Sequence, residues 1–235
     1  MILYDHLALS EDILEALSQL NIDYVFQPIF LKDGKTIYAR EALMRPKEMS
    51  VTDLIAKYEK MDKLHVIEIA TFFGAMQAYT LRGYTEKISI NSFPSDCMAI
   101  EEAEVFRDYF GDDIRGRMII EMLEYPSLSV KKWAMKNESV RYMDNMISLD
   151  DYGTGINDMD KVEFLNPDIV KLDRSLISDV DKDVYKQANC RDIIEQLHHM
   201  NKLVVAEGVE TKEEFEYLVG LGADLFQGYY LARPA

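Results

Sequence analysis

The chain has 235 residues, of which 48% are hydrophobic and 11% aromatic, so it carries enough apolar side chain to build a folded core. Its 26 basic and 42 acidic side chains give a net charge of −16, which argues against direct binding to DNA or RNA and against docking on an anionic membrane. No apolar stretch has the length of a transmembrane helix, and the first residues lack the basic start of a signal peptide. The two cysteines, Cys97 and Cys190, indicate no disulfide framework, so we expect a reducing, cytoplasmic compartment.

The chain begins with a predicted amphipathic helix within residues 1–20, for which Ser10 is the expected N-cap. Eight strand-like apolar runs follow, and longer segments with helical periodicity separate most of them. The strand-like runs are residues 24–30, 36–44, 87–93, 117–124, 146–153, 168–177, 203–210 and 225–232. The clearest helical segments are residues 65–83, 129–143, 184–201 and 211–222. Thr211 is the expected N-cap of the last helix, and Gly222 lies near its C-terminus.

The alternation of strands and helices predicts the fold class. Strands that are separated by helices pair in parallel through crossover connections, and eight of them in this length fit a TIM-like (β/α)₈ barrel. One connection differs, because residues 31–36 read LKDGKT and are too few for a crossover helix. Asp33-Gly34 in its centre is a hairpin turn signal. We therefore predict a barrel whose first strand is antiparallel to the rest.

Polar side chains interrupt the predicted strands near their C-terminal ends, where strands covered on both faces should be apolar. One such residue alone is more often a helix cap or a loop ion pair, but the repetition over seven strands favours a site. In a barrel, these strand ends open on a single face, where catalytic groups lie. Asp173 comes two residues after Lys171, so we expect it on the same strand face. The residues are Glu41, Asn91, Glu121, Asp150, Asp151, Lys171, Glu207 and Gln227.

The chemistry of this set predicts bound metal ions. Five carboxylates would meet at one mouth with Lys171 as the only evident basic partner, and such a cluster requires more positive charge. Carboxylate and amide oxygens suit hard divalent cations, Mg²⁺ or Mn²⁺. The adjacent Asp150 and Asp151 can serve two ions together, so we predict two-metal phosphoester hydrolysis.

The segment AREALMRP at residues 39–46, with QPI at 27–29 upstream, resembles the EAL-domain cyclic di-GMP phosphodiesterases of bacteria. Further segments resemble the motifs of this family in the same order along the chain. They are SINS, IIEMLE, LDDYGTG, DIVKLDRS, VVAEGVET and FQGYYLARP. The resemblance spans roughly residues 24–234, so we expect residues 1–235 to form a single EAL domain.

The resemblance implies a barrel with a reversed first strand and hydrolysis of cyclic di-GMP to linear pGpG, with two Mg²⁺ or Mn²⁺ ions. One ion would be held by Glu41, Asn91, Glu121 and Asp150, and the second by Asp150 and Asp151. Glu207, Lys171 and Asp151 are the implied catalytic residues, with Glu207 as the candidate general base. The implied substrate contacts are Gln27, Arg45 and Gln227, and the implied supporting residues are Glu124, Glu210 and Asp173. Glu124 would hold the loop of residues 151–155 in place.

The sequence departs from the family pattern at three places, which are Pro46, the Ser92-Phe93 pair and residues 156–158. None of these removes an implied metal ligand. The alternatives are a catalytically inactive cyclic di-GMP receptor and a protein-interaction module. The resemblance also implies a homodimer, for which residues 152–159 are the candidate interface, and any regulatory domains would lie outside this sequence.

Overall fold

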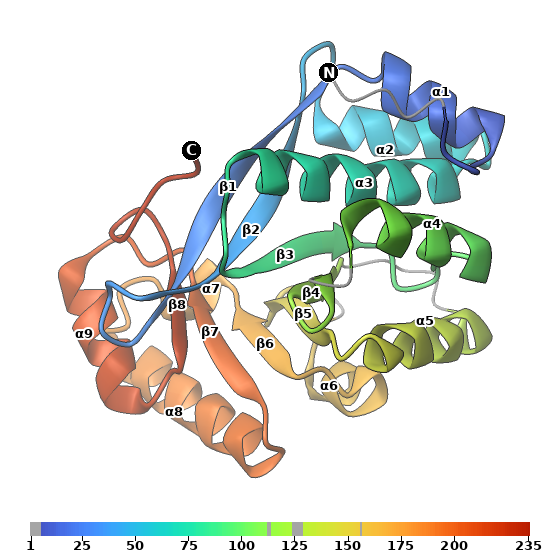
Figure 1. The fold of residues 1–235 in the computed structure, drawn as a ribbon. Coiled ribbons are helices and arrows are strands. Elements are labelled where there is room, and N and C mark those ends of the chain that lie inside the picture. Colours follow the sequence, from blue (N-terminus) through green and yellow to red (C-terminus); the bar gives the residue numbers. More distant parts are fainter. Residues whose placement is uncertain (1–5, 112–113, 124–128, 156) are drawn as a thin grey trace.

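The computed structural model describes residues 6–111, 114–123, 129–155 and 157–235, and these form a closed barrel surrounded by helices (Figure 1). The strands follow each other around the barrel in chain order. Their bounds are β1 Ile22–Leu31, β2 Ile37–Pro46, β3 Lys87–Ser92, β4 Met118–Met122, β5 Met146–Tyr152, β6 Ile169–Leu172, β7 Leu203–Glu207 and β8 Leu225–Gln227. The helices are α1 Glu11–Gln19, α2 Val51–Lys60, α3 Leu64–Leu81, α4 Ile100–Phe110, α5 Val130–Tyr142, α6 Met159–Leu165, α7 Arg174–Ile177, α8 Val184–His199 and α9 Lys212–Leu221. Figure 1 shows α1, α2 and α3 together on one side of the barrel, and α8 and α9 on the opposite side.

The first strand is antiparallel to both of its neighbours, β2 and β8, and the other neighbouring pairs are parallel. The hairpin between β1 and β2 is closed by Asp33, whose Oδ1 accepts hydrogen bonds from the backbone N–H groups of Lys35 at 2.9 Å and Thr36 at 2.8 Å. Gly34 has a φ of +64°, which a side chain disfavours. The predicted fold class and the reversed strand are therefore confirmed.

Several predicted strands continue beyond the observed ones, and the runs at 168–177 and 225–232 do so furthest. The run at 168–177 contains β6 only as far as Leu172, and its last four residues form the helix α7, because Asp173 caps that helix by accepting a hydrogen bond from Ser175 N at 2.8 Å. Ile177 in this helix is buried, so the apolar pattern continues although the strand has ended. The run at 225–232 likewise ends as a strand at Gln227.

The helix termini show which capping predictions the structure bears out. Thr211 accepts a hydrogen bond from Glu214 N at 3.1 Å and Gly222 adopts the left-handed conformation, as predicted for α9. Ser10 stands at the N-cap position of α1, but its side chain makes no capping hydrogen bond, and residues 6–10 are not helical. Residues 1–5 lie outside the described part. Cys97 and Cys190 are free thiols.

No helix among the described residues is long and apolar enough to cross a membrane.

The barrel interior away from the C-terminal strand ends is apolar. Its side chains form one buried cluster of Ile29, Ala39, Ile119, Ile169, Val205 and Leu225. We call this cluster the apolar floor, and the polar side chains at the C-terminal strand ends lie next to it.

Candidate active site

A layer of polar side chains closes the barrel interior above the apolar floor. Side chains alternate between the two faces of a strand, so residues two positions beyond an inward-facing one also point inward. Four buried polar residues lie two positions beyond the apolar residues that β2, β4, β6 and β8 contribute to the apolar cluster. They are Glu41, Glu121, Lys171 and Gln227. Alternate strands contribute each layer of a (β/α)₈ interior, and here the layer at the C-terminal strand ends is charged.

Lys171 lies at the centre of this layer and contacts four carboxylates. Its Nζ atom is 2.6 Å from Glu121, 3.0 Å from Asp150, 3.2 Å from Glu207 and 3.5 Å from Glu41. Burial opposes a charge on Lys171, but the four carboxylates outweigh it and raise its pKa well above the ordinary value. Burial, together with the neighbouring Glu41, raises the pKa of Glu121. The lysine therefore stays charged and is shared by more carboxylates than it can neutralise.

Asp150 and Asp151 reach the same site although they are neighbours in a strand. In a regular strand, adjacent side chains point to opposite faces. The register of β5 is irregular between Leu149 and Tyr152, and Asp151 has a φ of +51°. A non-glycine residue in this region costs about 1–3 kcal/mol, and such strain is typical of functional sites. Asp150, Asp151 and Glu207 each offer a carboxylate oxygen, and these oxygens all lie within 4.8 Å of one another.

The loop after β5 is held by a residue at which the chain departs from the family pattern. The Asn157 side chain is buried and donates a hydrogen bond through Nδ2 to the backbone oxygen of Asp150 at 2.8 Å. Its own backbone oxygen accepts one from Gly153 N at 2.9 Å. Asp158 caps α6 by accepting from Lys161 N at 3.1 Å. These departures therefore build the local structure that carries Asp150.

Further hydrogen bonds orient the carboxylates from their neighbours in the barrel. Gln227 donates to Glu41 at 2.7 Å, and Asn91 donates to the other oxygen of Glu41 at 3.3 Å. The buried hydroxyl of Ser89 donates to Glu121 at 2.7 Å. The sequence prediction missed Ser89, although it stands two residues before Asn91 and therefore faces the same way.

A second buried ion pair lies beside the site and was also missed. Lys136 of α5 and Glu68 of α3 are 2.8 Å apart, and their side chains are 3% and 2% exposed. Both contact the hydroxyl of Ser92, and Lys136 also donates to the backbone oxygens of Phe93 and Asp96, each at 2.6 Å. This network fixes the chain immediately after Asn91. The only sequence signal is a glutamate within the apolar run HVIEIATFF.

Several of the predicted site residues lie at the edge of this cluster. Arg45 is exposed and donates to the backbone oxygen of Met44 at 2.9 Å, and Gln27 donates to that of Ala232 at 3.3 Å. Glu210 forms an ion pair with Arg174 at 2.9 Å rather than facing the carboxylates. The expectation that Asp173 lies on the same strand face as Lys171 is wrong, because β6 ends at Leu172 and Asp173 caps α7. Glu124 lies outside the described residues, as does residue 156 of the candidate dimer segment.

The donor set fits hard divalent cations. Glu41, Glu121, Asp150, Asp151 and Glu207 place five carboxylates around one ammonium group. One oxygen each of Asp150 and Glu207 reaches Lys171 only as an ion-pair contact, and these oxygens make no hydrogen bond within the described residues. Burial raises the pKa of Glu207 to about 8. The neighbouring carboxylates Asp150 and Glu41 also raise it, and the positive charge of Lys171 opposes them. Oxygen ligands with this excess of negative charge are those that Mg²⁺ or Mn²⁺ binds.

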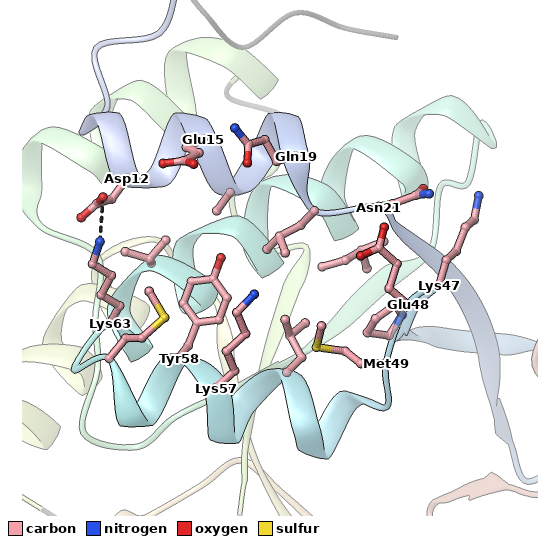
Figure 2. A pocket seen from close by; sticks show the side chains of 17 residues that line it. Asp12, Glu15, Gln19, Asn21, Lys47, Glu48, Met49, Lys57, Tyr58 and Lys63 are labelled. Carbon is pink, nitrogen blue, oxygen red and sulfur yellow. Dashed lines mark hydrogen bonds and ion pairs between the residues drawn. The ribbon is translucent and has the colours of Figure 1, made fainter.

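A cleft of about 280 Å³ opens beside the carboxylates and is lined by Glu41, Arg45 and Asn91 together with apolar side chains such as Phe93. A cleft of similar volume, about 290 Å³, lies between α1 and α2 (Figure 2). Its rim carries side chains of both charges, among which Lys63 and Asp12 form an ion pair at 2.8 Å. None of the clustered carboxylates Glu41, Glu121, Asp150, Asp151 and Glu207 lines it. The candidate active site is therefore the carboxylate cluster at the barrel mouth, next to the cleft that Glu41 and Asn91 line.

Comparisons with known proteins give the family of the chain and its fold. The model of the EAL domain family matches residues 10–234. The cyclic di-GMP phosphodiesterase TpdA of Vibrio parahaemolyticus is 31% identical over 144 residues, which cover 61% of this chain and 25% of that protein. The probable cyclic di-GMP phosphodiesterase PdeD of Escherichia coli is 32% identical over 118 residues, which cover 50% of this chain and 22% of that protein. The chain thus spans about a quarter of the length of the curated relatives it matches.

Solved structures show the same fold. A standalone EAL protein from Vibrio cholerae in its c-di-GMP-bound form superimposes with a TM-score of 0.83 at 25% identity, covering 92% of this chain and 93% of that one. The manganese and cy-diGMP complex of BlrP1 from Klebsiella pneumoniae superimposes with a TM-score of 0.76 at 23% identity, covering 93% and 57%.

Proposed function

Because the chain belongs to the EAL domain family, we propose that it is a metal-dependent phosphodiesterase that hydrolyses cyclic di-GMP to linear pGpG. The observation that carries this proposal is the convergence of every implied metal ligand on one mouth: Glu41, Asn91, Glu121, Asp150 and Asp151, with Glu207 beside them. The names of the relatives support the substrate and the reaction. Residues 1–235 act as a single domain in this proposal.

Two divalent cations, Mg²⁺ or Mn²⁺, supply charge neutralisation at the phosphate and a more acidic attacking water when they are bound. Asp150 would be the ligand shared by both ions. Glu41, Asn91 and Glu121 would complete the set for one ion, and Asp151 with Glu207 would complete the set for the other. The positive charge of Lys171 remains close to the phosphate as the reaction adds negative charge to it.

Glu207 is the proposed proton acceptor for the attacking water. Its side chain is 29% exposed, whereas that of Glu121 is fully buried and that of Glu41 is 7% exposed. A group that takes a proton from an incoming water must be within reach of that water. Glu207 meets this condition best among these three glutamates.

Substrate recognition is assigned to the residues around the mouth. Arg45 is exposed at the rim and long enough to turn toward a phosphate, and Gln27 and Gln227 offer amide groups. The apolar side chains of the cleft, such as Phe93 and Met44, suit the face of a guanine base. We further propose a homodimer whose interface includes residues 152–159; the exposed Phe164 on the adjoining helix α6 would extend this surface. Light scattering that shows only monomer at high concentration would refute the dimer.

The function is tested by separating turnover from binding. Purified protein is incubated with cyclic di-GMP and Mn²⁺, and the products are resolved by chromatography. We expect pGpG to accumulate. Binding of cyclic di-GMP without any product would instead indicate an inactive receptor, and absence of both binding and product would indicate a protein-interaction module.

A further inference from the structure

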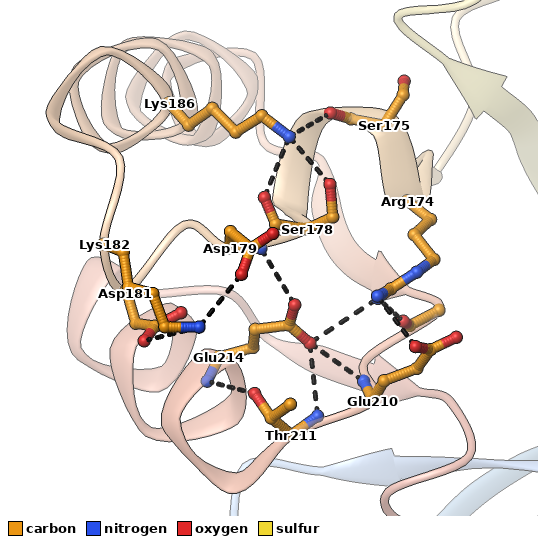
Figure 3. Close-up of polar contacts among 11 residues, drawn as sticks. Arg174, Ser175, Ser178, Asp179, Asp181, Lys182, Lys186, Glu210, Thr211 and Glu214 are labelled. Carbon is orange, nitrogen blue, oxygen red and sulfur yellow. Dashed lines mark hydrogen bonds and ion pairs between the residues drawn. The ribbon is translucent and has the colours of Figure 1, made fainter.

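Arg174 joins the end of β6 to the segment that follows β7. It is the first residue of α7, three positions after Lys171. Its guanidinium group donates to the backbone oxygen of Gly208, pairs with Glu210 at 2.9 Å and lies 3.5 Å from Glu214 (Figure 3). Gly208 directly follows Glu207. One arginine thus connects the strand that carries the site lysine with the residue next to Glu207.

Glu214 provides the buried anchor for this connection. Its residue is only 2% exposed, and one carboxylate oxygen accepts hydrogen bonds from the backbone N–H groups of Glu210 at 3.0 Å and Thr211 at 3.2 Å. The other oxygen accepts from Asp179 N at 2.9 Å. Glu214 therefore ties the segment after β7 to the segment after α7, and Figure 3 shows it between them.

The backbone at Gly208 has little room to move. A Cβ atom at this position would lie 2.8 Å from Cβ of Arg174, so the stem of the arginine packs directly on the glycine. On the next residue, Val209 N donates to Gln227 O at 3.0 Å, and Val209 O accepts from Tyr230 N at 3.1 Å. The direction in which the chain leaves Glu207 is thus fixed by Arg174 on one side and by β8 on the other.

We propose that Arg174 and Glu214 are positioning residues that hold Glu207 in the orientation in which it binds a divalent cation. This inference rests on the proposed function, since it assumes that Glu207 faces a metal ion. Neither residue contacts the carboxylate cluster in the described structure, so each acts through the backbone of residues 208–211. Partners that orient a metal ligand in this way commonly change metal affinity by about 10- to 100-fold when they are removed.

The test compares Arg174→Ala and Arg174→Lys with the control Lys212→Ala, all in the full chain. Lys212 forms an exposed ion pair with Glu216 on α9, close in sequence to Glu214 but outside the network. Two properties are measured without nucleotide: the affinity for Mn²⁺ by calorimetry and amide hydrogen exchange at residues 208–211. We expect Arg174→Ala to weaken Mn²⁺ binding about tenfold and to speed exchange at residues 208–211. We expect Arg174→Lys to fall between this variant and the wild type, and Lys212→Ala to match the wild type.

Unchanged Mn²⁺ affinity in Arg174→Ala would overturn the inference, and so would faster exchange spread evenly over the barrel, which indicates a merely structural role. Glu214→Gln tests the second residue by the same two measurements, because the amide keeps the size of the side chain but loses its charge. A wild-type chain that binds Mn²⁺ yet releases no pGpG would contradict the proposed function, whereas the ratio of Mn²⁺ affinities would still decide the positioning role. A wild-type chain that binds no Mn²⁺ would overturn both.

Discussion

The Nζ atom of Lys171 lies 2.6 Å from Oε1 of Glu121, and both side chains are almost completely excluded from solvent. They come from β6 and β4, which are separated by β5 in the barrel. Burying such a pair costs several kcal/mol of desolvation per ion, which the mutual attraction repays only with good geometry. Here the same lysine also faces Asp150, Glu207 and Glu41. The fold therefore keeps an excess of negative charge at this point, which divalent cations would relieve in the proposed function.

Metal dependence is the first prediction. We expect EDTA to abolish hydrolysis of cyclic di-GMP, and Mg²⁺ or Mn²⁺ to restore it. Ca²⁺ should bind but support little turnover, because its larger and looser coordination misplaces the attacking water. Mn²⁺ should also stabilise the folded chain and so raise its Tm. At an Mn²⁺ concentration of 100 Kd, the free energy of unfolding should increase by about 2.7 kcal/mol. Full activity after exhaustive chelation would rule out the two-metal mechanism.

The buried pair of Glu68 and Lys136 should be essential for stability. Lys136→Met leaves Glu68 as an unpaired buried charge, so we expect the free energy of unfolding to fall by about 3–5 kcal/mol. The double variant Glu68→Gln with Lys136→Met should recover part of this loss. Urea denaturation measures both, and Lys132→Met, at an exposed position of the same helix, is the control. A loss no larger than that of Lys132→Met would contradict the network.

His65 should make the stability depend on pH above neutrality. Hydrogen bonds to Asp96 at 2.6 Å and Glu102 at 2.9 Å raise its pKa from 6.5 to about 10. A pKa that is raised in the folded state stabilises the fold fully below pH 6.5, and this contribution is lost as the pH rises toward 10. The difference in Tm between wild type and His65→Gln should therefore shrink across this window. The exposed His199→Gln variant is the control for the substitution itself, and a constant difference for His65→Gln would refute the pairing.

Two glycines should respond in opposite ways to alanine. A Cβ at Gly228 would lie 2.1 Å from Val209 O and 2.3 Å from Val209 N, so the backbone must shift next to Gln227. We expect Gly228→Ala to lower the free energy of unfolding by about 1–3 kcal/mol or more. Gly220 is exposed in α9 with nothing within 4 Å of its added Cβ, so Gly220→Ala should stabilise by about 0.5–1 kcal/mol. Chemical denaturation of both variants checks the pair, and a destabilised Gly220→Ala would contradict the helix position.

The sequence was sufficient to predict the barrel and the inward placement of Glu41 and Lys171, because both follow from local patterns. Alternation along a strand places Glu41 and Lys171 inside, and a short turn with Asp33-Gly34 reverses β1. The network of Glu68 and Lys136 could not be predicted, since its partners are 68 residues apart and meet only in the folded chain. The prediction for Asp173 was wrong although its interaction is local. Its side chain caps α7, and this hydrogen bond ends the strand even though the apolar pattern continues.

The most direct test of the account is the turnover of Asp150→Asn. Asp150 is the proposed ligand shared by both ions, so the loss of its charge removes several kcal/mol of transition-state stabilisation, or about 10³-fold in rate. Production of pGpG is measured at saturating Mn²⁺ beside thermal melts, with the exposed Asp108→Asn as the control. We predict that Asp150→Asn loses about 10³-fold in rate, and the thermal melts separate this loss from any change in stability. A rate within about tenfold of wild type would contradict the assignment of the site.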